Sequence, residues 1–124
     1  MRKAFDAVNR RDAEWLIEHS AADIEMRGTG VAGEPVLYIG AAGIRGFFHD
    51  IAESWQSLQF VPEEIQESGD RVLAIVNQRL RGRGSGIDVE GKLGFVLELH
   101  DGVAVRITAY RDVAEALADL GSDA

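Results

Sequence analysis

The sequence predicts an α+β fold in which helices pack on one face of a curved antiparallel sheet. In the first part of the 124 residues, apolar side chains recur mainly at helical spacing. In the second part, long alternating stretches typical of strands are separated by glycine-containing turns, which antiparallel hairpins require. Helices followed by such a meander of strands are typical of α+β domains.

The chain is predicted to form a single domain over residues 1–124. Its hydrophobic (46%) and charged (27%) fractions are those of a globular protein, and no repeat or low-complexity linker divides it. No apolar stretch approaches the roughly 20 residues that cross a bilayer, so the sequence predicts no membrane partner. Cysteine is absent, which excludes a disulfide framework and a thiol nucleophile and fits a cytoplasmic location.

The formal net charge is −8, from 13 basic and 21 acidic residues. A chain this acidic repels phosphate backbones, so the sequence predicts no nucleic-acid partner. Arg79, Arg81 and Arg83 alternate and would share one face of a strand. Such a stripe could bind an anion, but pairing with nearby carboxylates on a solvated surface is the favoured interpretation.

Helical patterns occupy four stretches. A short apolar stripe predicts a first helix around residues 4–8, and Asp12 is a favoured N-cap for a second helix through residue 17. The clearest helix is predicted over 41–56, and a last one over 112–120. The apolar stripe of the third helix consists of Ile44, Phe47, Phe48, Ile51 and Trp55.

Strand patterns occupy residues 24–27 and 36–39 and then four long stretches from about Leu58 onward. In the stretch 87–99 the alternation of apolar and polar residues predicts one buried face and one solvent-exposed face. The stretch 71–80 has apolar residues on both faces, which indicates that the outer face is covered as well. A homodimer, sheet against sheet, is the simplest cover and would bury Leu73, Ile75 and Val96.

Several short segments, in this order and spacing, are shared with a known family. They are Ala4-Phe5, Asn9-Arg10-Arg11-Asp12, Ala22-Asp23-Ile24-Glu25-Met26-Arg27, Tyr38-Ile39-Gly40, Gly43-Ile44-Arg45-Gly46-Phe47, Gly69-Asp70-Arg71-Val72, His100-Asp101-Gly102 and Ala116-Leu117. On these segments the chain resembles the SnoaL-like branch of the NTF2-like superfamily over nearly its whole length. The resemblance implies a cystatin-like or NTF2-like roll, a cone with an apolar pocket between sheet and helices, often as a dimer. The family includes polyketide cyclases, ketosteroid isomerases and epoxide hydrolases, so fold alone does not choose a function.

The resemblance also allows a test for isomerase chemistry, which uses a carboxylate base, a tyrosine and a protonated acid. When the hairpin glycines are aligned, the acid position falls at Phe95 and the base at Gly28, or at Arg27 if the register slips. The tyrosine position falls at Ala4 or Phe5, so all three groups are missing. The first helix is also shorter than the family usually shows. Either the pocket mouth is less covered, or the native chain begins upstream.

Other motifs for chemistry are weak. His19, His49 and His100 are scattered and lack metal-ligand spacing, so no metal is predicted. Residues 28–33 match G-x-G-x-x-G but lead into a strand rather than a helix, which argues against a dinucleotide site and predicts a loop at the pocket lip. Ser85 does not lie in a nucleophile-elbow pattern. The sequence therefore predicts no cofactor.

One polar residue stands where apolar ones are expected. By strand parity Gln78 shares the inner face with Val76, and a buried amide without partners costs about 1–3 kcal/mol. Either a neighbour satisfies the amide, or it is aimed at a ligand. Arg111 could pair with an acidic ligand at the pocket mouth, although pairing with Glu25 or Asp112 is the favoured alternative. The remaining residues expected to line the pocket are Met26, Tyr38, Phe47, Trp55, Phe60, Phe95, Ile107 and Ala109.

Three hypotheses for function remain open. The favoured one is a pocket that binds a small apolar or aromatic molecule, oriented by Gln78 and Tyr38. The second is a cyclase, isomerase or hydrolase whose acid or base would be Glu25, Glu64 or His49. The third is a homodimeric interaction module without a ligand, which uses the outer face of the sheet.

Overall fold

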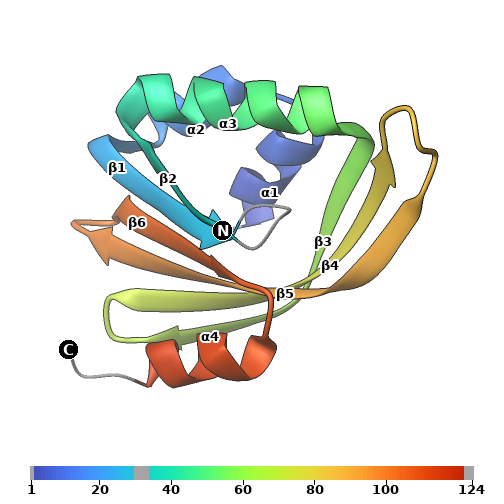
Figure 1. The fold of residues 1–124 in the computed structure, drawn as a ribbon. Coiled ribbons are helices and arrows are strands. Elements are labelled where there is room, and N and C mark those ends of the chain that lie inside the picture. The colour runs from blue at the N-terminus through green and yellow to red at the C-terminus, as the bar shows by residue number, and fades with distance from the viewer. Residues whose placement is uncertain (1, 30–33, 122–124) are drawn as a thin grey trace.

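The computed structural model describes residues 2–29 and 34–121 and confirms the α+β class (Figure 1). A curved, unclosed sheet faces α1, α2 and α3 on one side and α4 on the other (Figure 1). The elements, in chain order, are α1 Arg2–Asn9, α2 Ala13–Glu18, β1 Ser20–Thr29, β2 Pro35–Ile39, α3 Gly40–Ser54, β3 Trp55–Ser68, β4 Arg71–Gly82, β5 Asp88–His100, β6 Val103–Tyr110 and α4 Val113–Leu120. None of these helices is long and apolar enough to cross a bilayer.

The described strands form one sheet in the order β2-β1-β6-β5-β4-β3. All neighbours are antiparallel except β1 and β6, which pair in parallel. Gly69 and Gly102 adopt φ values of 60° and 79° in the β3–β4 and β5–β6 turns, a conformation that favours glycine. These two turns lie where the sequence predicted them, and they set the register of the long hairpins.

The main core fills the space between the inner face of the sheet and helices α1, α2 and α3. Phe5 of α1 packs edge-on against Phe60 and Phe95, with ring centroids 6.1 and 5.2 Å away. The side chain of Asn9 donates to the backbone oxygen of Phe60 and accepts from its N–H, both at 2.8 Å. This pair of hydrogen bonds ties the end of α1 to β3.

The outer face of the sheet is covered by α4, which corrects the prediction that all helices pack on one face. Leu73 and Val96 are completely buried there, together with Ala116 of α4. Ile75 packs against the same cluster. The expectation that a second copy covers these side chains is therefore wrong for Leu73 and Val96, because α4 covers them. The homodimer stays a prediction, without this support.

Three local details differ from the sequence-based boundaries. Trp55 begins β3 and does not end the third helix, so α3 stops at Ser54. Ile87 and Val89 were predicted to face the core but are 64% and 39% exposed. They belong to the far end of the β4–β5 hairpin, which extends past the helices in Figure 1. Of the predicted glycine loop, residues 28 and 29 end β1, and 30–33 lie outside the described residues.

Candidate functional site

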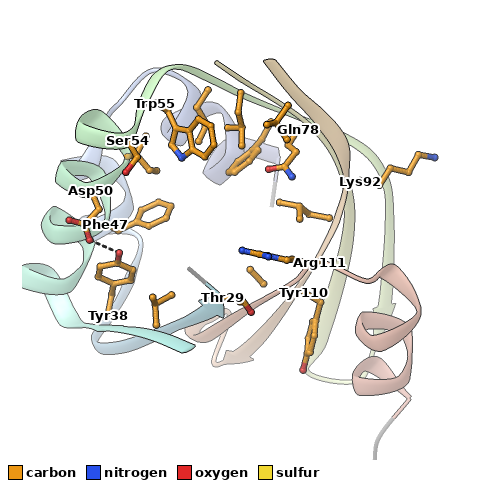
Figure 2. A pocket seen from close by; sticks show the side chains of 18 residues that line it. Thr29, Tyr38, Phe47, Asp50, Ser54, Trp55, Gln78, Lys92, Tyr110 and Arg111 are labelled. Atoms are coloured by element: carbon orange, nitrogen blue, oxygen red, sulfur yellow. Dashed lines mark hydrogen bonds between the residues drawn. The ribbon is translucent and has the colours of Figure 1, made fainter. Parts of the chain in front are cut away.

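A cavity of about 530 Å³ opens between α3 and the inner face of the sheet (Figure 2). Ligand sites in proteins usually measure about 300–1,000 Å³. Its wall is largely apolar and aromatic, and strands β2 to β6 all contribute to it together with α3. The apolar lining residues are Val36, Phe47, Ile51, Trp55, Leu58, Phe60, Leu80, Val89, Leu93 and Ala109.

Seven of the ten residues predicted for the pocket line this cavity. They are Tyr38, Phe47, Trp55, Phe60, Gln78, Ala109 and Arg111. The other three, Met26, Phe95 and Ile107, pack against the main core cluster instead. Strand parity places them correctly on the inner face, but side chains of the main core cluster fill that part of the cone. Parity alone cannot distinguish the packed part of an inner face from the open part.

Gln78 lies on β4 in the wall that faces α3, and Figure 2 shows its side chain pointing into the cavity. Within residues 2–29 and 34–121, its amide makes no hydrogen bond. Its polar atoms are also not closed off from the open space of the cavity. Among these residues, therefore, no protein neighbour satisfies the amide of Gln78.

Tyr38 and Asp50 form a polar pair on the opposite side of the cavity. The Tyr38 hydroxyl donates to a carboxylate oxygen of Asp50 at 2.6 Å (Figure 2). Burial, and then the hydrogen bond to Asp50, raise the pKa of Tyr38 to about 12, so its phenol stays protonated at neutral pH. Gly40, with φ 65°, turns the chain from β2 directly into α3 and thereby sets the helix over the strand.

Arg111 follows the last residue of β6 and extends its guanidinium into the cavity from the sheet side (Figure 2). Two other polar lining residues turn their polar ends elsewhere. The Lys92 ammonium lies 3.5 Å from Glu63, and the Tyr110 hydroxyl donates to Asp119 at 2.7 Å. Both side chains point away from the cavity in Figure 2.

The three residues first suspected of acid–base chemistry all lie outside the cavity. Glu25 accepts from Arg27 at 2.8 Å and is 3.5 Å from Arg106. The pKa of Glu25 is held below its usual range, mainly by the hydrogen bond from Arg27, which favours the ionised form. Glu64 is exposed on β3, and His49 is exposed on the surface of α3. None of them lines the cavity.

Asp50 is the functional candidate that sequence reasoning missed. Among the described lining residues it alone carries a carboxylate. The available signal was its position on α3, three residues after Phe47 and four before Ser54, because such residues share a helix face. All three line the cavity.

Asp50 also belongs to a group that has the spacing of metal ligands. Ligand atoms of His49, Asp50 and Glu53 lie within 4.8 Å of one another on α3, and all three residues are exposed. His49 is 3.2 Å from Glu53, one helical turn away, and Asp50 accepts from Tyr38. These contacts account for the cluster as ordinary pairing on a solvated helix face.

The arginine stripe is a solvated surface, as favoured from the sequence. Arg79 and Arg81 each approach a carboxylate of β5, at 3.7 and 2.8 Å, and Arg83 donates to a backbone carbonyl of α3. These contacts account for the three guanidinium groups without a bound anion.

A family model for the SnoaL-like domain matches residues 1–110. No curated protein matches the chain at a significant level.

Solved structures reproduce the fold. An NTF2-like protein of unknown function from Burkholderia pseudomallei K96243 is 21% identical, with a TM-score of 0.80 over 98% of this chain and 94% of that one. TerC co-crystallised with polyporic acid is 22% identical, with a TM-score of 0.75 over 94% and 90%. A protein from Jannaschia sp. CCS1, proposed to be a SnoaL-like polyketide cyclase, is 14% identical, with a TM-score of 0.71 over 95% and 84%. At these identities the likeness shows a shared fold.

Proposed function

The chain belongs to the SnoaL-like domain family, and on that premise we propose that it binds a small aromatic or apolar molecule between α3 and the sheet. The cavity has the volume and the aromatic wall that such a ligand requires. The observation that carries the proposal is Gln78, whose amide enters this wall without a hydrogen bond to the described residues.

The physical argument concerns the cost of that amide. An apolar side chain of similar size would pack against Phe60 and Leu80 without losing contacts to water. A glutamine at the same place loses its contacts to water when a ligand fills the cavity, which is costly unless the ligand offers a donor or an acceptor. A ligand with a carbonyl or hydroxyl group on an aromatic body does both: the polar group forms a hydrogen bond with the Gln78 amide, and the aromatic body fills the apolar space. TerC, which shares the fold and was co-crystallised with polyporic acid, supports the choice of ligand class.

The catalytic alternative has less support. Glu25, Glu64 and His49 do not line the cavity. The carboxylate of Asp50, which does, already accepts the Tyr38 hydroxyl. The geometry therefore favours binding as the primary role of the cavity.

The proposal is tested with N-phenylnaphthylamine, an uncharged aromatic probe that fluoresces strongly in apolar surroundings. We expect saturable binding with one site per chain. Ala109→Trp places an indole in the cavity and should abolish binding. Ala118→Trp, the same substitution at an exposed position of α4, should leave it unchanged. Thermal melts test whether both variants fold.

Two results would contradict the proposal. One is the absence of saturable binding to the unaltered chain. The other is equal binding by the folded Ala109→Trp variant, which would place the probe at another surface.

A further inference from the structure

We propose that the ligand of this cavity carries an anionic group, such as a carboxylate, and that Arg111 binds this group with help from Gln78. The inference rests on the proposed binding function and specifies the chemical class of the ligand. It follows from the charges that the cavity presents and from their positions in its wall.

Among the described lining residues on the sheet side, Arg111 is the cation whose charged end enters the cavity. Arg111 follows Ala109 by two residues, so both side chains project to the same side, and Ala109 lines the cavity. Figure 2 shows the guanidinium reaching into the space between the sheet and α3. The neighbouring cation, Lys92, points away toward Glu63.

The surroundings make this guanidinium suited to an oxyanion. Arginine stays charged at every physiological pH and offers planar N–H donors that match a carboxylate in two parallel hydrogen bonds. Arg111 is exposed, so the attraction between opposite charges strengthens when the aromatic body of a ligand displaces water from the guanidinium. Gln78 lies in the same wall and adds N–H donors, because its amide has no hydrogen bond among the described residues.

The opposite wall determines the orientation of the ligand. Asp50 on α3 carries a negative charge and accepts from Tyr38. An anionic group is repelled there and attracted to Arg111, so the acidic end of the ligand lies against the sheet. The other end faces Asp50, where a hydroxyl group of the ligand can donate to the carboxylate.

The experiment compares two probes with the same aromatic body. Anilinonaphthalene sulfonate carries a sulfonate, and N-phenylnaphthylamine lacks it. We expect the unaltered chain to bind the sulfonate probe at least about tenfold more tightly, the effect of a charge-assisted hydrogen bond. The net charge of −8 acts against this preference at long range, so a preference for the anion reports a local site.

Two variants identify the residue responsible. Arg111→Gln should weaken binding of the sulfonate probe about tenfold or more and change binding of the neutral probe less than about twofold. Arg79→Gln is the matched control, because it is the same substitution at an exposed arginine of β4 that does not line the cavity. It should leave both affinities within about twofold, since exposed charges contribute little.

The outcomes separate this inference from the proposed function. If the neutral probe binds and the sulfonate probe binds no tighter, the inference is wrong and the binding function stands. If Arg111→Gln weakens both probes equally, or Arg79→Gln acts as strongly, Arg111 does not recognise the anion and the inference is again wrong. If neither probe binds, the proposed function fails and the inference falls with it.

Discussion

Asn9 and Gln78 are two amide side chains of the interior that differ in their hydrogen bonds. Asn9 makes two, to the backbone N–H and oxygen of Phe60. Gln78 makes none with the described residues and faces the cavity. The sequence identified Gln78 from strand parity, because a single polar residue interrupts an apolar face. It gave no comparable signal for Asn9, whose role depends on a contact with a strand distant in sequence.

This contrast predicts opposite effects on stability. Gln78→Leu should leave the free energy of unfolding unchanged or raise it by up to about 1 kcal/mol, because no protein hydrogen bond is lost and apolar contact is gained. Asn9→Leu should lower it by about 2 kcal/mol, because both backbone groups of Phe60 lose a partner. Urea denaturation of the two variants measures these differences. A loss of similar size in Gln78→Leu would show that the amide has a structural role.

At the scale of elements, the position of α4 depends on a glycine in the strand beneath it. A side chain at Gly94 of β5 would collide with Ala116 of α4, so only glycine allows the helix to lie this close to the sheet. The sequence predicted the helix from its capping Asp112, which accepts from Ala114 at 2.8 Å. It placed the helix on the same face as the others, which is wrong, because β4 is apolar on both faces and the close approach at Gly94 is a tertiary feature without a local signal.

Gly94→Ala should therefore destabilise the protein by about 1–3 kcal/mol, the usual cost of overpacking, and should loosen α4 from the sheet. The matched control is Gly91→Ala in the same strand, where an added Cβ meets no atom within 4 Å. Gly91→Ala should be neutral or slightly stabilising, since glycine in a strand is unfavourable. Thermal melts of both variants, with hydrogen exchange of the α4 amides, measure the effect. Equal stability of the two variants would contradict the packing described for α4.

At the scale of the whole molecule, the order of elements and the class of fold followed from the sequence. The change from helical spacing to alternation, together with glycine turns, fixes which stretches pair with their neighbours along the chain. The parallel pairing of β1 with β6 had no local signal, because it joins strands at opposite ends of the chain. The cavity could be predicted only in part, because its extent also depends on contacts between segments that are distant in sequence. Parity gives the inner face, whereas the part that helices leave open depends on how α1 and α3 lie over it.

The two tyrosines make the stability of the molecule depend on pH in the alkaline range. Burial, and then a hydrogen bond to an aspartate, raise the pKa values of Tyr38 and Tyr110 to about 12. In the unfolded chain both ionise near their usual pKa of about 10. The folded state holds its phenolic protons longer, so this stabilisation is complete below about pH 10 and is lost as the pH rises toward about 12.

The chain contains only these two tyrosines, so the ultraviolet absorbance of phenolate reports them directly. In the folded protein we expect no phenolate signal near pH 10 and ionisation of both groups near pH 12. Chain unfolded in urea should titrate about two units lower and serves as the control. Tyr38→Phe should leave the delayed ionisation of Tyr110 in place. A folded-state titration near pH 10 would contradict the hydrogen bonds to Asp50 and Asp119.

The direct passage from β2 into α3 has a consequence for how proteins of this architecture diverge. Because no loop separates the two elements, Tyr38 and Asp50 are carried by one continuous stretch of chain, residues 35–54. In the facing wall, Gln78 belongs to the long β4–β5 hairpin, and Arg111 follows the last residue of β6. Mutations within this one stretch alter the wall of the cavity that faces the sheet and leave the hairpin register untouched. Selection can thus reshape this wall within one contiguous block of sequence while the scaffold is inherited unchanged.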